Sequence, residues 1–236
     1  MIKKILAVAL AIVLTVLVFA GCSKKAENVD VNGVDKPVAY NENGYAIFDE
    51  EGHIRIYDTD ENGRIIYDEQ GNPGYKYYDG DGYLYHDGMI DTPQYALAMP
   101  SGWEYSGTST FFKKDTDNKC KVQIFVALED GSQIESFVAT NRESNKEVMA
   151  KTEAEYEGYK AEMTTDDFVF GTKEIQAYTN TYKVTDADGK VIHYAVDMFV
   201  LMDGKVYDIN YLCTNGIGYD ESFDFVNYIK ENFIAK

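Results

Sequence analysis

The side chains best suited to metal chemistry are concentrated between Asp58 and Glu69. This stretch has acidic or amide oxygens at its first, third, fifth and last positions, and a glycine at its sixth. Ca²⁺ binds roughly six to eight hard oxygen ligands, and a glycine permits the sharp turn between them. The candidate Ca²⁺ ligands are Asp58, Asp60, Asn62 and Glu69.

That spacing resembles the Ca²⁺ loop of EF-hand proteins, which requires a helix on each side. Here the flanking segments Ile54–Tyr57 and Gly71–Gly74 have the composition of a strand and a turn. A stretch rich in Asp, Asn and Gly also produces this spacing without binding metal. We therefore favour a hairpin turn over a metal loop. Weak binding of extracellular Ca²⁺ by the acidic turns is a further interpretation.

A group of tyrosines follows the acidic stretch. It resembles the aromatic hairpin repeats of cell-wall-binding modules, which implies stacking of a glycan or a choline on exposed rings. The candidate stacking residues are Tyr77, Tyr78, Tyr83 and Tyr85. The single tryptophan, Trp103, lies outside this region, where we expect it to anchor the core. Aromatic cross-strand pairs that hold a thin sheet together are the favoured alternative.

The sequence predicts no catalytic residue and no cofactor. The three histidines, His53, His86 and His193, are isolated from one another and from every cysteine, so the spacing typical of zinc sites is absent. No nucleophile elbow, glycine-rich phosphate loop or paired catalytic cysteine motif appears. We therefore predict that the protein is not an enzyme. A hydrolase whose site is assembled from distant residues is the alternative.

The first residues have the pattern of an export signal. Met1–Lys4 carries two positive charges, and Ile5–Ala20 is apolar except at Thr15. The end of this run, Phe19-Ala20-Gly21-Cys22, resembles the bacterial lipobox, with Phe19 in place of the usual leucine. The resemblance implies removal of residues 1–21 and a lipid anchor on Cys22 that holds the protein outside the cytoplasm. A retained signal anchor is the alternative.

Cys120 and Cys213 both lie in predicted strands. Outside the cytoplasm such a pair can form a disulfide bond. Two buried free thiols are the alternative, because the sequence does not fix the Cα separation that the bond requires.

The charge balance limits the partners. Acidic residues number 40 against 22 basic ones, and the formal net charge is −18. This argues against nucleic acid, whose phosphates need Lys and Arg clusters, and against adsorption to anionic lipid. We expect the membrane contact to be the lipid anchor, and the partner to be an envelope protein or a cell-wall glycan.

Residues 22–39 are polar and predict a linker. Over residues 40–91, short aromatic strands alternate with Asn-Gly and Asp-Gly turns, which predicts a degenerate β-hairpin repeat. Each repeat unit is expected to supply one strand and one turn. A pair formed by an aromatic residue and Asp recurs at Phe48, Tyr57, Tyr67 and Tyr78. No single unit could bury its apolar face, so the repeat is expected to stack on itself or to dimerise.

Residues 92–236 predict an α+β domain, in which an antiparallel sheet packs against two helices. Strands are expected over residues 178–184, 191–201 and 205–213, with Asp203-Gly204 as a hairpin turn. A capping box at Ser132–Glu135 predicts the start of one helix. The residues expected on its buried side are Ile134, Phe137, Val138 and Val148. A second helix is expected over Asp220–Ile234.

This layout resembles the PsbP-like family of small α+β-sandwich proteins. The matching features are the strand Tyr95–Pro100 running into Ser101–Trp103, the first helix, the strand Gly204–Ile209 and the closing helix. The resemblance implies a non-catalytic role. We therefore predict a membrane-anchored extracytoplasmic lipoprotein that binds or assembles other components. The alternative is an adhesin or solute-binding protein that binds glycan or Ca²⁺ through the repeat.

Overall fold

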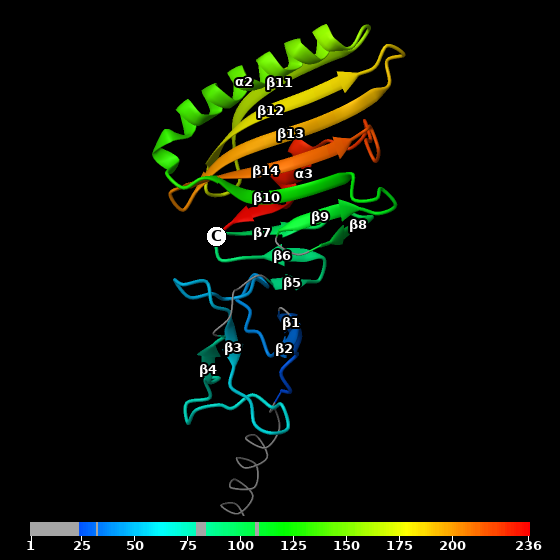
Figure 1. Cartoon of the computed structure of the whole chain (residues 1–236). Helices are drawn as coiled ribbons and strands as arrows, with labels where there is room; N and C mark the ends of the chain where they lie inside the picture. The colour runs from blue at the N-terminus through cyan, green and yellow to red at the C-terminus, as the bar shows by residue number, and fades with distance from the viewer. Residues whose placement is uncertain (1–23, 32, 79–83, 107–108) are drawn as a thin grey trace, which may run out of the picture. The chain divides into compact units, whose positions relative to one another are not determined.

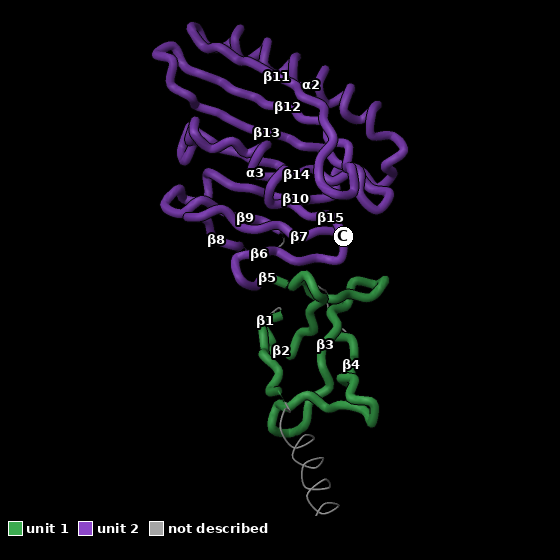
Figure 2. Tube along the Cα trace, turned by 180° about the vertical axis from the view of Figure 1, so that it is seen from behind, with its two compact units in different colours: residues 1–84 green, residues 85–236 purple. Residues whose placement is uncertain are grey.

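The structure is a computed structural model that describes residues 24–31, 33–78, 84–106 and 109–236. The chain divides into two compact units, residues 1–84 and 85–236 (Figure 2). The sequence placed this boundary after residue 91. It lies earlier because the strands β5 (Leu84–His86) and β6 (Met89–Asp91) pair into a sheet with β7 (Tyr95–Ala98) of the C-terminal unit.

The N-terminal unit is built from short antiparallel pairs. β1 (Val29–Val31) pairs with β2 (Val34–Lys36), and β3 (Arg55–Tyr57) pairs with β4 (Tyr75–Tyr77). Isolated bridges such as Phe48 to Ile54 connect the rest. The buried residues of its small core are Val31, Val38, Ala46, Ile54, Ile56 and Leu84.

One turn recurs along this unit. At Asp60, the side-chain Oδ1 accepts hydrogen bonds from the backbone N–H groups of Asn62 and Arg64, at 2.9 Å each. Gly63 adopts a φ of 74° and donates its N–H to the carbonyl of Asp60. Asn41, Asp49 and Asp68 close turns with the same pattern of hydrogen bonds. The side-chain oxygens of Asn41, Asp49, Asp60 and Asp68 therefore accept hydrogen bonds from the backbone of their own turns.

The C-terminal unit contains a seven-stranded antiparallel sheet in the order β11-β12-β13-β14-β10-β9-β8 (Figure 1). Its strands are β8 (Trp103–Tyr105), β9 (Thr110–Lys113), β10 (Cys120–Leu128), β11 (Lys160–Phe170), β12 (Ile175–Thr185), β13 (Val191–Met202) and β14 (Lys205–Thr214). The predicted meander of β12, β13 and β14 is present, with Asp203 and Gly204 at its hairpin turn. β11 was not predicted from the sequence.

Different layers cover the two faces of this sheet. The helix α2 (Ile134–Glu155) lies along one face, over the end formed by β11 and β12 (Figure 1). On the other face, α3 (Phe225–Asn232) and β15 (Phe233–Ala235), which pairs with β7, enclose the main core. Trp103 is buried in that core, as expected. The unit therefore has an α+β fold with an antiparallel sheet between two helices. No helix in the described ranges is long and apolar enough to cross a membrane.

Both predicted helix boundaries need correction. The capping residue before α2 is Asp130, which accepts the N–H of Ser132 at the start of a short 3-10 helix (Gly131–Gln133), so the capping box is wrong. Val148, expected on the buried side of α2, is 55% exposed. The last helix begins only at Phe225, after the cap Asp224, and ends at Asn232, because the chain then pairs as β15.

A buried ionic cluster links the ends of β5 and β6 to Lys236. Asp91 is fully buried and forms an ion pair with Lys236. Its other oxygen lies 3.3 Å from Nε2 of His86, which is also buried. Burial lowers the pKa of His86, but the hydrogen bonds and charges of Asp91 and Asp87 outweigh it, so the pKa is raised overall.

Candidate functional site

A row of polar side chains crosses the sheet of the C-terminal unit. The pairing register places six residues directly opposite one another on successive strands. In strand order they are Thr165, Asn180, Asp197, Asn210, Gln123 and Thr110. Residues directly opposite in a sheet lie on the same face. This is the face that α2 covers, because Asn180 contacts Arg142 of that helix.

The middle of α2 supplies polar partners for one end of this row. Asn180 is fully buried, and its Oδ1 accepts a hydrogen bond from Nε of Arg142 at 2.7 Å. The same guanidinium forms an ion pair with Asp167 on β11. Asn141 accepts hydrogen bonds from the side chains of Asn180 and Tyr182. The guanidinium of Arg142 is therefore already bound by Asn180 and Asp167.

Two acidic residues lie near the centre of the row: Asp197 belongs to it, and Asp208 lies beside it. The amide Nδ2 of Asn210 donates to Oδ1 of Asp197 at 2.5 Å. Asp208, two residues before Asn210 on β14, lies on the same face and diagonal to Asp197. It is only 6% exposed, and its Oδ1 has no hydrogen-bond partner among the described residues.

Burial dominates the electrostatics of this pair. It raises the pKa of Asp197, although hydrogen bonds from Asn210 and Tyr182 oppose it. Burial and the Asp197 carboxylate together raise the pKa of Asp208 well above its usual range. Both groups therefore hold their protons more strongly in the folded protein than in an unfolded chain.

A cavity lies between the second half of α2 and the strands β12, β13 and β14. Its volume is about 500 Å³. Apolar walls come from Val148, Met149, Val184, Ile192, Ala195 and Leu212. Polar groups come from Asn145, Thr152, Tyr182, His193, Asp197 and Asn210. We call this cavity the α2 groove. Burial lowers the pKa of His193.

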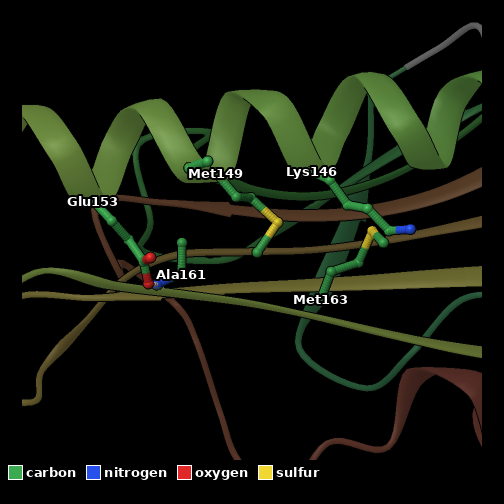
Figure 3. Close-up of a pocket in the computed structure, with 6 residues that line it drawn as sticks. Lys146, Met149, Glu153, Ala161 and Met163 are labelled. Carbon is green, nitrogen blue, oxygen red and sulfur yellow. Dashed lines mark hydrogen bonds between the residues drawn. The ribbon is translucent and has the colours of Figure 1, made fainter.

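The opposite flank of α2 has a second, smaller cavity of about 280 Å³. Figure 3 shows Met149 pointing from α2 toward the strands and Met163 pointing from β11 toward the helix. Glu153 closes one end by accepting the N–H of Ala161 at 2.9 Å. Cavities flank α2 on both sides, and its only buried residues are Ile134 and Val138 in the first turns, so its second half packs loosely on the sheet.

The structure does not bring the four candidate Ca²⁺ ligands together. Oδ1 of Asp60 is engaged by its own turn, Asp58 lies 3.5 Å from Nζ of Lys76, and Glu69 belongs to the next turn. Asn62 donates its backbone N–H to Asp60. Strand and turn flank the segment, without the helices that an EF-hand needs.

Three other side chains that could bind a metal ion, those of Asp49, Glu51 and His53, lie close together within one turn. One ligand atom from each of Asp49, Glu51 and His53 lies within 4.8 Å of the others. Nδ1 of His53 is 3.1 Å from Asp49 and 3.6 Å from Glu51. The same Asp49 side chain closes the turn through the N–H groups of Glu51 and His53, so hairpin geometry accounts for this proximity.

The candidate stacking tyrosines have different environments. Tyr77 is 41% exposed on β4, but the guanidinium of Arg55 lies 5.5 Å from its ring and 4.7 Å from that of Tyr75. Tyr78 packs beside the small core, with Nζ of Lys36 4.8 Å from its ring. Tyr85 belongs to the C-terminal unit and stacks on Tyr105. Tyr83 lies outside the described residues.

Cys120 and Cys213 are both fully buried and both free in this structure. The hydroxyl of Tyr211 lies 3.2 Å from the sulfur of Cys213 and 3.8 Å from that of Cys120. A hydrogen bond from Cys213 lowers the pKa of Cys120. Cys22, the predicted lipidation site, lies outside the described residues, and its lipidation stays a prediction.

Sequence reasoning did not single out Asn180, Asp197, Asp208 or Asn210. A signal was present, because Asp197, Asp208 and Asn210 interrupt otherwise apolar strands. Polar residues in the middle of a strand usually face solvent, so only the register and the position of α2 identify these side chains as part of a buried site.

No protein-family model matches this chain, and no curated protein matches its sequence. Among solved structures, the chain is similar to the solution structure of cyanobacterial PsbP (CyanoP) from Synechocystis sp. PCC 6803. The two have 13% sequence identity and a TM-score of 0.34, over 60% of this chain and 86% of that chain. A likeness at this level carries no information about ligands, partners or activity.

Proposed function

We propose that this chain is an extracytoplasmic lipoprotein, anchored through Cys22, whose C-terminal unit binds a small ligand in the α2 groove. The proposed role is non-catalytic. The export signal and lipobox pattern of residues 1–22 support the location. The binding or assembly role is proposed from the sequence, in which the order of elements over residues 92–236 resembles the PsbP-like family.

The α2 groove carries the proposal. Protein interiors are close-packed and seldom leave voids larger than a water molecule. Small-molecule sites typically enclose roughly 300–1,000 Å³ and have apolar walls with a few polar groups. The groove has about 500 Å³ and this type of lining. Val148, 55% exposed on its wall, would gain apolar contact from a ligand.

A matched pair of substitutions tests the groove. Val148→Trp is expected to fill it, whereas Val169→Trp makes the same change at a 56% exposed position on β11 that does not line it. The full chain in zwitterionic lipid nanodiscs would be titrated calorimetrically with three phenyl compounds: 2-phenylethanol, 2-phenylethylamine and 3-phenylpropionate. The methyl resonance of Met149 would report binding in the groove.

At least one of the three compounds should bind wild type and the Val169→Trp variant, shift the Met149 signal, and fail to bind the Val148→Trp variant. The difference between the two variants removes any contribution from partitioning into lipid. If all three compounds fail to bind wild type, or if they bind the Val148→Trp variant equally well, the groove is not a ligand site.

A separate measurement tests the anchor. In the host envelope, the wild-type chain should incorporate an alkyne-labelled fatty acid and sediment with membranes. The Cys22→Ser variant should lose the label, because the thiol that accepts the lipid is gone. Equal labelling of both chains would contradict lipidation at Cys22.

The exposed aromatic cluster of the N-terminal unit favours one second candidate, a glycan-binding surface. Tyr67, Tyr75 and Tyr77 are each 40–41% exposed, and Ile66 is 49% exposed. Cell-wall glycan pull-down with wild type and a Tyr77→Ala variant separates the two candidates. Loss of binding in the variant would support the adhesin, and absence of binding by wild type would exclude it.

A further inference from the structure

The strongest unexplained feature of the C-terminal unit is an acidic pair without a counter-charge. Asp197 and Asp208 lie on neighbouring strands and on the same face. Neither carboxylate forms an ion pair with any described residue. Asp208 is only 6% exposed, and its Oδ1 has no hydrogen-bond partner among the described residues.

The arginine of α2 does not neutralise this pair. Its guanidinium donates to Asn180, to the backbone carbonyl of Thr179 and to Asp167. Asn210 satisfies one oxygen of Asp197 but brings no charge. Buried carboxylates are normally paired with a cation, because removing an uncompensated charge from water is costly.

The pair lies at the end of the α2 groove. Asp197 and Asn210 line the groove directly, and Asp208 lies next to them on the same face, two residues before Asn210 on β14. The rest of the lining combines apolar side chains with the uncharged side chains of Asn145, Thr152 and Tyr182. Burial lowers the pKa of His193, the only histidine in the lining. The groove therefore has one acidic residue, Asp197, and no Lys or Arg among the described residues that line it.

We propose that the α2 groove binds a small organic cation, an amine or guanidinium joined to an apolar body. The cationic group would donate hydrogen bonds to Asp197, and its positive charge would favour the ionised forms of Asp197 and of the neighbouring Asp208. The apolar body would lie between Val148 and Leu212. This inference rests on the proposed function, since it names the ligand class for the same groove.

The three phenyl compounds introduced above test this assignment, because they share a ring and differ in the charge of the end group. In calorimetric titrations of the full chain in nanodiscs, 2-phenylethylamine should bind roughly tenfold or more tightly than 2-phenylethanol, as expected for a charge-assisted hydrogen bond. The anion 3-phenylpropionate should bind more weakly than the alcohol, because the acidic end of the groove repels it.

Asp197→Asn keeps the shape of the side chain and removes its charge. It should lower the affinity for the amine roughly tenfold and leave that for the alcohol unchanged. Asp166→Asn is the control, because Asp166 is exposed on the opposite face of β11. Should Asp197→Asn fail to fold, Asp208→Asn provides a second variant in which the amine loses affinity and the alcohol does not.

The outcomes distinguish failure of the cation assignment from failure of the groove as a ligand site. If the alcohol or the acid binds as tightly as the amine, and Val148→Trp abolishes that binding, the groove is a ligand site and the cation assignment is wrong. An amine affinity that Asp197→Asn and Asp208→Asn both leave unchanged would also overturn the assignment. If no compound binds, the proposed function fails together with it.

Discussion

Cys120 and Cys213 lie directly opposite each other on β10 and β14, with their sulfur atoms 2.7 Å apart. Directly opposed residues of an antiparallel pair have Cα atoms about 4.5–5.5 Å apart. A disulfide requires a separation of roughly 4.4–6.8 Å. The register of these two strands therefore meets the distance condition that the sequence left open.

We expect the protein isolated from the cell envelope under non-reducing conditions to contain a Cys120–Cys213 disulfide. Alkylation in denaturant without reductant, followed by peptide mapping, should recover the linked peptides. The bond would close a loop of about 93 residues. Loop-closure entropy then predicts that a Cys120→Ser, Cys213→Ser double variant loses about 4.6 kcal/mol of unfolding free energy. Recovery of both cysteines as alkylated thiols would contradict the prediction.

Asp208→Asn should stabilise the C-terminal unit at neutral pH. Because the folded pKa of Asp208 is raised, the native state keeps a proton that the unfolded chain releases above about pH 4. Wild-type stability should therefore fall as pH rises toward the folded pKa. The amide removes this contribution, so the variant should gain about 1–2 kcal/mol at pH 8 and less at pH 5. Urea unfolding at both pH values measures the difference. A constant gap between the two proteins would count against this assignment.

Asp91→Asn should destabilise the C-terminal unit by about 3 kcal/mol, the usual cost of removing one partner from a buried ion pair. The substitution leaves His86 and Lys236 without the carboxylate that they share. Chemical denaturation monitored through Trp103 follows this unit. A Glu104→Gln change, which disrupts only an exposed ion pair with Lys114, should have little effect.

His86 gives that cluster its own pH dependence. Its folded pKa is raised, so its contribution to stability is complete below the unfolded value of about 6.5 and is lost as pH rises through the folded value. Unfolding free energies measured from pH 5.5 to 8.5 should fall less steeply in a His86→Gln variant than in wild type. Parallel profiles would show that His86 is not coupled to folding.

Asp60→Ala should loosen one hairpin of the N-terminal unit, because it removes the acceptor of two backbone N–H groups. The expected loss of stability is small and of the same kind as the loss of a helix cap. Asp60→Asn keeps the acceptor and should be close to neutral. Hydrogen exchange at Asn62 and Arg64 reports the change locally. Equal exchange rates in both variants would show that the side chain does not hold the turn.

The parts of the fold predicted from the sequence are those with local signals. The Asp203-Gly204 turn and the apolar alternation on either side of it indicated β13 and β14 almost to the residue. Lys160–Phe170 was missed because most of β11 is exposed and carries no apolar alternation. Phe233 fits the helical spacing of α3, yet pairing with Leu97 places it in a strand.

The candidate site was less accessible to sequence reasoning, because it depends on register. Asn180, Asp197 and Asn210 are far apart in the chain and meet only when three strands align. The acidic residues from Asp58 to Glu69, in contrast, suggested a Ca²⁺ loop because they lie within one short segment of the sequence. In the structure that spacing follows from successive hairpin turns rather than from a shared ligand.

The recurrent turn of the N-terminal unit also bears on the order in which the chain folds. Each such turn closes over four residues, as from Asp60 to Arg64, whereas Cys120 meets Cys213 across 93. Short-range hairpins form within microseconds, and long-range strand pairing is far slower because loop closure precedes any gain from contact. In an exported chain, the N-terminal unit should therefore become ordered while the seven-stranded sheet that follows it in the sequence is still assembling.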